Sequence, residues 1–351
     1  MIFLAGFARS GTTWVSSVID SHPDVLYRHE FFGRRFALLG DQLFRKLKFD
    51  SGLSDEDYIT AVGILAGADV QTDKPPFFSK RFRSLGRPSI QKVAWLVART
   101  MPVLSRAYAR FFTPRDCQDV ALVVKETGAA IWLESFMAGM RADKLIVLVR
   151  HPYAVIASHV VGSRAGLLQT AGDNYRRSWF MHHSTRAKYL QGIEWERVAD
   201  MPEVEYLALS WRVQNEEYLR LCASFPRSKI MLYEAFVSSP ISETTDMLQF
   251  LNLTPDEQVF GFLEASTSGK ASVYARLGNA SSEYYNVYRG KGFDPEKWTR
   301  TLSDDDLKLI DTHTAALVGE LGLDRWMSRG SPSVGPQSGP VSDPVTSERL
   351  T

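Results

Sequence analysis

The segment GFARSGTT, residues 6 to 13, combines residue types and a spacing that suit the binding of a phosphate-like anion. Gly6 and Gly11 have the spacing of a phosphate-binding loop, and Thr13 supplies the usual hydroxyl, but Thr12 stands where a lysine is expected. Glycines let the backbone curl so that several amide hydrogens converge on one anion, and a following helix adds its positive end. The segment therefore predicts an anion site between a strand and a helix.

Arg9 lies inside this loop and brings the positive charge that the missing lysine would have supplied. The side chains of Ser10, Thr12 and Thr13 can donate further hydrogen bonds to an anion. Gly11 belongs to the turn that presents the backbone amides. We predict that these five residues together bind an anionic group of the ligand.

Basic residues follow three of the apolar segments. Arg9 comes after the first run, Lys125 follows residues 120–124, and Arg150 follows residues 145–149. A triphosphatase normally places an aspartate after a second strand to hold magnesium, and no apolar run in this sequence ends that way. The pattern favours a strongly anionic ligand that is bound without a metal ion.

The segment VRHPYAVIASH, residues 149 to 159, predicts a second part of the anion site. Pro152 suits the first turn of a helix, which leaves Arg150 on the loop before it. Ser158 lies roughly two turns further along, so its hydroxyl reaches an anion held by Arg150 only if that anion lies along the flank of the helix. Arg150 alone would also suit a structural salt bridge, but its pairing with Ser158 and the first loop favours anion binding.

Short apolar runs alternate with longer amphipathic stretches, as is typical of parallel α/β proteins. The predicted strands are Ile2 to Ala5, Val120 to Val124, Leu145 to Val149 and Lys229 to Leu232. The predicted helices are Thr12 to Ser21, Ala129 to Met140, Pro152 to Val161 and Ile241 to Leu251. Because the strands are short and apolar, helices should cover both faces of the sheet. The predicted fold class is α/β, with a doubly wound, mostly parallel sheet whose ligands lie outside the carboxyl ends of the strands.

Two long stretches, residues 34 to 115 and 162 to 206, interrupt this pattern. Both look helical in part and are rich in aromatic and arginine residues. Most of the aromatic residues suit a core. The functional alternative is that the two insertions cap the sheet and form an acceptor pocket. Residues 328 to 351 contain almost no large apolar side chains, so we expect a domain over residues 1 to 327 followed by a disordered tail.

Composition and charge narrow the classes of function. At 351 residues and 44% hydrophobic residues, the chain can bury a sizeable core. Its 41 basic and 40 acidic residues nearly cancel, so no global field favours nucleic acid or a membrane, and any anion site must be local. Cys117 and Cys222 suit reduced thiols rather than a disulfide framework. The sequence shows neither a cleavable leader nor an apolar run of roughly 20 residues, so we expect a cytoplasmic protein without a transmembrane segment.

Four motifs in order resemble the sulfotransferases that use 3'-phosphoadenosine 5'-phosphosulfate (PAPS). They are SGTTW after the first strand, VVKETG at 123 to 128, RHP with a serine eight residues beyond the arginine, and LYEAFVSSP at 232 to 240. The resemblance covers residues 1 to about 325. It implies that PAPS is the donor, that no metal is required, and that a hydroxyl group is the acceptor.

The resemblance also implies roles for individual residues. The first loop would hold the 5'-phosphosulfate with Arg9 as its cation, while Arg150 and Ser158 would hold the 3'-phosphate. The segment YRGKGFDPEKW at 288 to 298 is similar to a family loop that closes over the 3'-phosphate, which implies roles for Arg289 and Lys291.

Two positions near these motifs leave alternatives open. Trp14 looks like the family tryptophan near the adenine, with a core position as the alternative. The family often has aspartate at the position of His151, a departure that is expected to weaken the cap of the following helix.

The reaction needs a base that accepts a proton from the acceptor hydroxyl, and residues 22 to 32 offer candidates. If the segment is extended, His29 and Glu30 point to opposite faces, so only one of them can face the donor. Glu30 resembles the carboxylate base of the carbohydrate and bacterial members of the family, and it is our choice over His29. The alternative is that Glu30 forms a surface ion pair with a neighbouring arginine. Lys125 is suited either to assist the transfer at the sulfuryl group or to fill a structural role.

Two other classes of function share parts of this pattern. A magnesium-dependent phosphoryl-transfer enzyme would share the first strand, loop and helix, and a nucleotide-binding module without catalysis would share the whole donor site. Thr12 in place of lysine disfavours the first class. The sequence leaves the acceptor open, with a saccharide or a lipid-linked hydroxyl among the candidates, and it leaves the oligomeric state open too.

Overall fold

Five short segments form one parallel sheet in the order β2-β3-β1-β4-β5. The computed structural model describes residues 1–34, 39–49, 52–83, 87–115, 120–128, 130–268, 287 and 297–326. The strands are β1 (Ile2–Gly6), β2 (Val25–His29), β3 (Ala121–Thr127), β4 (Lys144–Val149) and β5 (Ser228–Leu232). All four predicted strands are confirmed, and each boundary moves by no more than a few residues. The doubly wound α/β prediction is confirmed as well.

Alternate residues of the strands face two different hydrophobic cores. In β1, Phe3 and Ala5 belong to one buried cluster, whereas Ile2 and Leu4 belong to the other. This alternation follows from the two-residue period of a strand. Both faces of the sheet are therefore covered, as the apolar strands predicted.

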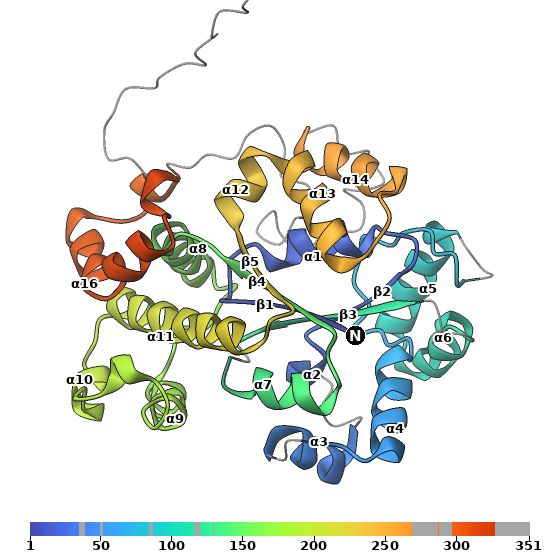
Figure 1. The fold of residues 1–351 in the computed structure, drawn as a ribbon, viewed down its shortest axis with the longest axis horizontal. Helices are drawn as coiled ribbons and strands as arrows, with labels where there is room; N and C mark the ends of the chain where they lie inside the picture. The colour runs from blue at the N-terminus through green and yellow to red at the C-terminus, as the bar shows by residue number, and fades with distance from the viewer. Residues whose placement is uncertain are drawn as a thin grey trace, which may run out of the picture.

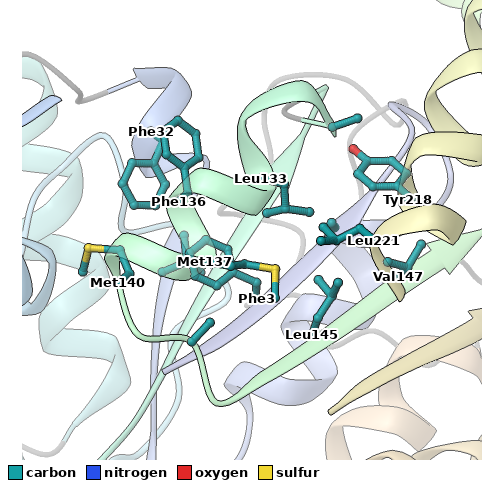
Figure 2. Packing of buried hydrophobic residues seen from close by; sticks show 14 of the residues in the cluster. Phe3, Phe32, Leu133, Phe136, Met137, Met140, Leu145, Val147, Tyr218 and Leu221 are labelled. Atoms are coloured by element: carbon teal, nitrogen blue, oxygen red, sulfur yellow. The ribbon is translucent and has the colours of Figure 1, made fainter. Parts of the chain in front are cut away.

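Helices from distant parts of the sequence cover the two faces. One face is covered by α1 (Thr12–Asp20), α12 (Tyr233–Ser238), α13 (Pro240–Leu251) and α14 (Glu257–Thr267), which lie above the sheet in Figure 1. The other is covered by α2 (Phe31–Arg34), α7 (Ala130–Gly139) and α11 (Glu203–Ser224). Figure 2 shows Leu133, Phe136 and Met137 of α7 packed near Phe3 of β1. The helices α8 (Pro152–Arg164) and α16 (Asp304–Glu320) lie beside α11.

The two insertions are helical in part, as expected. The first contains α3 (Gly40–Phe49), α4 (Asp55–Ala66), α5 (Pro88–Thr100), η2 (Pro102–Leu104) and α6 (Ser105–Phe112). The second contains α9 (Asp173–His183), η3 (Lys188–Leu190) and α10 (Trp195–Ala199); η5 (Lys297–Arg300) and η6 (Asp324–Trp326) flank α16. Trp95, Tyr108 and Trp179 are buried, so the core interpretation of these aromatic residues is confirmed. The predicted tail, residues 328 to 351, lies outside the described residues.

A buried ion pair ties the first insertion to the sheet. Arg28 of β2 donates from Nη1 to Asp73 Oδ1 over 2.8 Å, and both side chains are almost fully buried. The same guanidinium donates to the main-chain carbonyls of Leu65 and Ala66 at the end of α4. Tyr108 of α6 donates to Asp73 Oδ2 over 2.7 Å. One arginine on an edge strand therefore anchors three segments of the insertion.

Two further expectations concern membranes and cysteines. In the part of the chain that the structure describes, no helix has both the length and the apolar composition needed to cross a bilayer. Cys222 is a half-buried free thiol, and Cys117 lies outside the described residues. The cytoplasmic location stays a prediction.

Replacement of Asp73 should destabilise the fold strongly. Asp73→Asn leaves the buried Arg28 guanidinium without its counter-charge, and breaking a buried pair on one side costs about 3 to 5 kcal/mol. Urea denaturation would measure this change in the free energy of unfolding. The control is Asp246→Asn, which removes a more exposed pair with Lys229 and should cost less than about 1 kcal/mol. Equal effects of the two variants would contradict the anchoring role of Arg28.

Candidate active site

The loop between β1 and α1 has the backbone that the phosphate-loop pattern predicts. Arg9 and Gly11 have positive φ angles of 71° and 91°, and the amide of Ser10 donates to the carbonyl of Phe7 over 3.1 Å. Helix α1 begins at Thr12 without a side-chain hydrogen bond at its N-cap. The first amides of a helix have no partner within the helix, so they are available to an anion.

Both glycines of the motif are required by their surroundings. A Cβ atom at Gly11 would lie 2.4 Å from the ring of Tyr233, and one at Gly6 would lie 2.6 Å from the carbonyl oxygen of Leu148. The loop is therefore packed tightly between β4 and α12. Ser10 is fully buried in this loop, and its Oγ has no hydrogen-bond partner among the described residues. An unpartnered buried hydroxyl is costly, and a bound anion would satisfy it.

The segment after β4 meets this loop through two hydrogen bonds. Arg150 Nη1 donates to the carbonyl oxygen of Arg9 over 3.1 Å, and Arg9 Nε donates to Ser158 Oγ of α8 over 3.2 Å. The three residues were predicted to lie together, and the structure brings them together. Ser158 contacts the side chain of Arg9, and Arg150 contacts its main chain, so Arg9 joins the two.

Arg150 is held in place by three neighbours. Its guanidinium carbon lies 4.5 Å from the centre of the Tyr233 ring, and Trp211 Nε1 donates to its carbonyl oxygen over 3.1 Å. Burial lowers the pKa of Arg150, an effect that the charge of Glu234 opposes. Its Nε is shielded from solvent and has no hydrogen-bond partner among the described residues. The arrangement leaves a preorganised cation with an unsatisfied donor.

His151 caps α8 despite the change from the family's aspartate. Its Nδ1 accepts a hydrogen bond from the amide of Tyr153 over 3.3 Å. Burial and the neighbouring charge of Arg150 lower the pKa of His151 to about 3, so the ring is neutral at pH 7 and Nδ1 can accept. The expected weakening of the helix cap is therefore offset, because a neutral imidazole can accept the capping hydrogen bond as a carboxylate would.

Tyr233 and Glu234 support the site, although the sequence reasoning gave them no role. Glu234 is fully buried, and its Oε1 accepts from the amide of His151 over 3.0 Å. Burial raises the pKa of Glu234, while the His151 amide and Arg150 lower it. The available signal was an acidic residue two positions after the end of β5, since parallel strands end at one edge of the sheet.

His159 is a second residue that the sequence reasoning did not identify. Its Nε2 lies 3.4 Å from the carbonyl oxygen of Ala8, and its ring contacts Phe7 at 5.9 Å between centroids. Burial lowers the pKa of His159 to about 4. Helix α8 therefore contacts the loop at Ala8 as well as at Arg9.

Glu30 lies at the same edge of the sheet and is paired with Lys125. Its Oε1 accepts from Lys125 Nζ over 2.6 Å and from Thr127 Oγ1 over 2.8 Å. The register pairs Gly6 of β1 with Thr127 of β3, so one strand joins Glu30 to the start of the loop. Lys125 was predicted to follow its strand, but β3 continues to Thr127 and Lys125 lies within it.

The pKa of Glu30 lies well below its ordinary range. Burial by itself raises this pKa, but the charges of Lys125 and His29 and the hydrogen bonds from Lys125 and Thr127 lower it by more. The carboxylate is therefore ionised at pH 7 and able to accept a proton. The sequence left a surface ion pair with Arg28 or Arg34 as the alternative: Arg28 pairs with Asp73 instead, the side chain of Arg34 lies outside the described residues, and Glu30 pairs with Lys125.

His29 and Glu30 lie on the same side, contrary to the alternation expected of an extended segment. Strand β2 ends at His29, and Glu30 has a φ angle of 48°, so the backbone turns before the alternation can continue. His29 Nε2 lies 3.7 Å from Glu30 Oε2, and His29 Nδ1 lies 2.9 Å from the hydroxyl of Tyr27. The two candidate bases are therefore neighbours. Which of them acts as the base depends on their chemistry rather than on the direction in which they point.

The remaining predicted residues differ in where they lie. Trp14 is only 1% exposed, its Nε1 donates to Ser266 Oγ over 3.0 Å, and its ring meets Phe236 edge-on, so it lies in the core, the alternative that the sequence left open. Thr12 is buried and Thr13 is exposed at the start of α1. Arg289 and Lys291 lie outside the described residues.

In the described ranges, no group of three or more His, Cys, Asp and Glu side chains is arranged to hold a metal ion. The loop, Arg150 and the unpartnered atoms of Ser10 and Arg150 suit an anion instead. Independence of metal ions stays a prediction.

Glu30→Gln should remove a pH-dependent part of the stability. Because folding lowers the pKa of Glu30 below its ordinary value of 4.5, its contribution is present above that pH and is lost as the pH falls further. We expect the variant to be less stable than the wild type by about 1 to 3 kcal/mol at neutral pH. This difference in stability should become smaller in acid. Denaturant titrations at several pH values would measure it.

The exposed Glu320 of α16 provides the control for this test. Glu320→Gln should change the free energy of unfolding by less than about 0.5 kcal/mol at every pH. If the difference in the free energy of unfolding between the wild type and Glu30→Gln did not vary with pH, Glu30 would not be held as an ionised partner of Lys125.

Comparisons with known proteins concern the family to which the chain belongs. A sequence model of the sulfotransferase family matches residues 2–257. A carbohydrate sulfotransferase 1 from Danio rerio is 23% identical over 179 residues, which are 51% of this chain and 38% of that protein. The chain therefore matches well under half the length of that relative.

Solved structures of sulfotransferases are similar at low identity. A sulfotransferase domain from the olefin synthase of Synechococcus PCC 7002 has 19% identity and a TM-score of 0.43, over 89% of this chain and 93% of that one. A mouse sulfotransferase complexed with PAP has 13% identity and a TM-score of 0.47, over 92% and 85%. The assignment rests on the sequence model, which covers most of the chain: this protein belongs to the sulfotransferase family.

Proposed function

We propose that this protein transfers a sulfuryl group from PAPS to a hydroxyl group of an acceptor. The observation that carries the proposal is that two sets of hydrogen-bond donors suited to anions meet at one sheet edge. One is the loop before α1, with the unpartnered Ser10 hydroxyl, and the other is Arg150 with its unpartnered Nε beside Ser158 and Arg9. A donor with a phosphosulfate and a separate 3'-phosphate needs two such sites.

In the proposed complex, the loop amides and the hydroxyls of Ser10, Thr12 and Thr13 hold the phosphosulfate. Arg150 and Ser158 hold the 3'-phosphate, with Arg289 and Lys291 of the C-terminal segment as further candidates. Arg9 lies between the two groups, since it contacts Ser158 through Nε and belongs to the loop. Most of the catalytic effect then comes from positioning and from fixed charges.

Glu30 is the proposed base. It accepts the proton of the acceptor hydroxyl while the acceptor oxygen forms a bond to sulfur. The bond between sulfur and the bridging oxygen breaks, 3',5'-adenosine bisphosphate leaves, and Arg9 stabilises the charge on the bridging oxygen. His29 is the alternative base, because it lies against the same carboxylate.

Lys125 adjusts the strength of this base. While Lys125 is bound to Glu30, the carboxylate is ionised but has a low affinity for a proton. A bound donor brings negative charge that competes for the ammonium group of Lys125. As Lys125 turns toward the sulfuryl group, the pKa of Glu30 rises toward the range in which a general base works well at neutral pH.

A carbohydrate or another saccharide-like hydroxyl is the proposed acceptor. A carboxylate base and the resemblance to a carbohydrate sulfotransferase support this choice. The two helical insertions, which we propose cap the acceptor side, would then determine specificity.

Binding of 3',5'-adenosine bisphosphate tests the donor site. Calorimetry should show tight binding that is the same with and without magnesium, and Arg150→Ala should weaken it about tenfold to a hundredfold through loss of a charged hydrogen bond. The control is Arg164→Ala at the exposed end of α8, which should bind as the wild type does. A preference for magnesium-bound ATP would favour a phosphoryl-transfer enzyme instead.

Turnover tests the base. Glu30→Gln should lower kcat by about 10²- to 10⁴-fold with a saccharide acceptor, while bisphosphate affinity stays unchanged. His29→Gln is the matched variant and should retain most of the activity. Wild-type turnover of Glu30→Gln would exclude Glu30 as the base. Bisphosphate binding without turnover of any acceptor by the wild type would favour a non-catalytic module.

A further inference from the structure

The segment α5–η2–α6, which we call the hairpin, exposes an unusual amount of apolar surface. Of the 15 large hydrophobic side chains that are exposed among the described residues, 8 lie between positions 90 and 111. They are Ile90, Val93, Leu96, Val97, Met101, Val103, Leu104 and Phe111. Val103 is 78% exposed and Phe111 is 65% exposed. A concentration of exposed apolar side chains in one segment is typical of an interaction site.

The exposed apolar face is built into the helices. In α5, Gln91, Trp95 and Ala98 are buried with a helical spacing, whereas Val93 and Val97 lie on the opposite side. In α6, Tyr108 and Phe112 point inward. The hairpin therefore has two apolar faces, one packed on the protein and one turned to solvent.

The stretch of sequence that contains the hairpin carries charges of a single sign. From Lys74 to Arg115 the sequence contains ten lysine and arginine residues and no aspartate or glutamate, although the whole chain has a net charge of only +1. Arg87, Arg99, Arg106, Arg110 and Arg115 of this segment are exposed. An apolar face with cations at its margin is complementary to the surface of an anionic lipid bilayer, which offers acyl chains beneath negatively charged headgroups.

The hairpin is attached rigidly to the rest of the molecule. Trp95 Nε1 donates to the carbonyl oxygen of Val70 over 2.9 Å, and Tyr108 donates to Asp73, which is the partner of Arg28 in β2. Figure 1 shows α5 and α6 at one edge of the molecule, on the side of β2 and β3 and away from α9, α10 and α16. A membrane could therefore approach this face without meeting those helices.

We propose that the hairpin binds the interface of an anionic lipid membrane, with its apolar side chains among the headgroups and its arginines on lipid phosphates. This mode of binding requires no membrane-spanning helix, because the helices lie in the plane of the interface. The inference does not depend on the sulfuryl-transfer reaction. It adds a second, separate interaction to the protein, and the anchoring through β2 fixes the orientation of Glu30 relative to the lipid surface.

Sedimentation of the full chain with lipid vesicles tests the proposal. Vesicles of phosphatidylcholine mixed with phosphatidylglycerol should bind the protein, vesicles of phosphatidylcholine alone should bind it much more weakly, and added salt should weaken the binding. The double variant Val103→Ser, Phe111→Ser should lower the partition coefficient about tenfold or more. The double variant Arg106→Glu, Arg110→Glu should do the same.

Matched variants elsewhere on the surface serve as controls. Ile59→Ser with Ile241→Ser changes side chains of 69% and 67% exposure, and Arg164→Glu with Lys188→Glu changes the net charge equally. Both should bind vesicles within about twofold of the wild type. Bisphosphate calorimetry on each variant verifies a folded donor site, which separates failure of this proposal from failure of the proposed function.

Two results would overturn the proposal. One is that anionic vesicles bind the wild type no better than neutral ones, or bind hairpin and control variants equally. The other is that a second copy of the chain covers the exposed face of the hairpin. Gel filtration would then show a dimer that does not bind vesicles and that the double variant Val103→Ser, Phe111→Ser dissociates.

Discussion

Positive charge gathered at one edge of the sheet is the constraint on which the rest of this structure depends. Arg9 and Arg150 come from segments 141 residues apart and meet where β1 and β4 end. Lys125 lies on the neighbouring strand. Lys125 is paired with Glu30, and the charge of Glu234 opposes the effect of burial on Arg150. The Ser10 hydroxyl and Arg150 Nε have no hydrogen-bond partner among the described residues, which agrees with the proposed doubly anionic donor.

The neighbouring side chains hold these charged groups in place. Tyr233 supports the guanidinium of Arg150 with its ring, and Trp211 holds the adjacent carbonyl. Glu234 supplies a buried carboxylate that offsets part of the positive charge and holds the amide of His151. These contacts come from α11 and α12, so the position of Arg150 depends on packing between distant segments rather than on a single loop.

Strand β2 links the chemistry to the outer surface of the protein. It carries Arg28, which is bound to the first insertion, and it ends immediately before Glu30. Glu30 is in turn bound to Lys125 of β3. The residue that binds the insertion and the proposed base are therefore only two positions apart in the chain. In this way the hairpin, the edge strand and the carboxylate form one connected unit.

The sequence by itself determined four of the five strands, the loop that contains Gly6 and Gly11, and the helix that follows it. These features are local: strand periodicity, glycine spacing and a proline in the first turn of α8 depend on short-range sterics and hydrogen bonding. The same local signals placed Arg9, Arg150 and Ser158 at the carboxyl edge, because parallel strands must end together. Residues 289 and 291 are outside the described part of the chain.

Only the tertiary structure decided which partners these residues have. The pairing of Glu30 with Lys125, the contact of Ser158 with Arg9 and the burial of Trp14 all join segments or environments that no local pattern specifies. Alternation along an extended strand separated His29 from Glu30, but the left-handed backbone of Glu30 ended the strand and brought them together. Long-range packing sets burial, and burial sets the pKa values and the charges that remain available to a ligand.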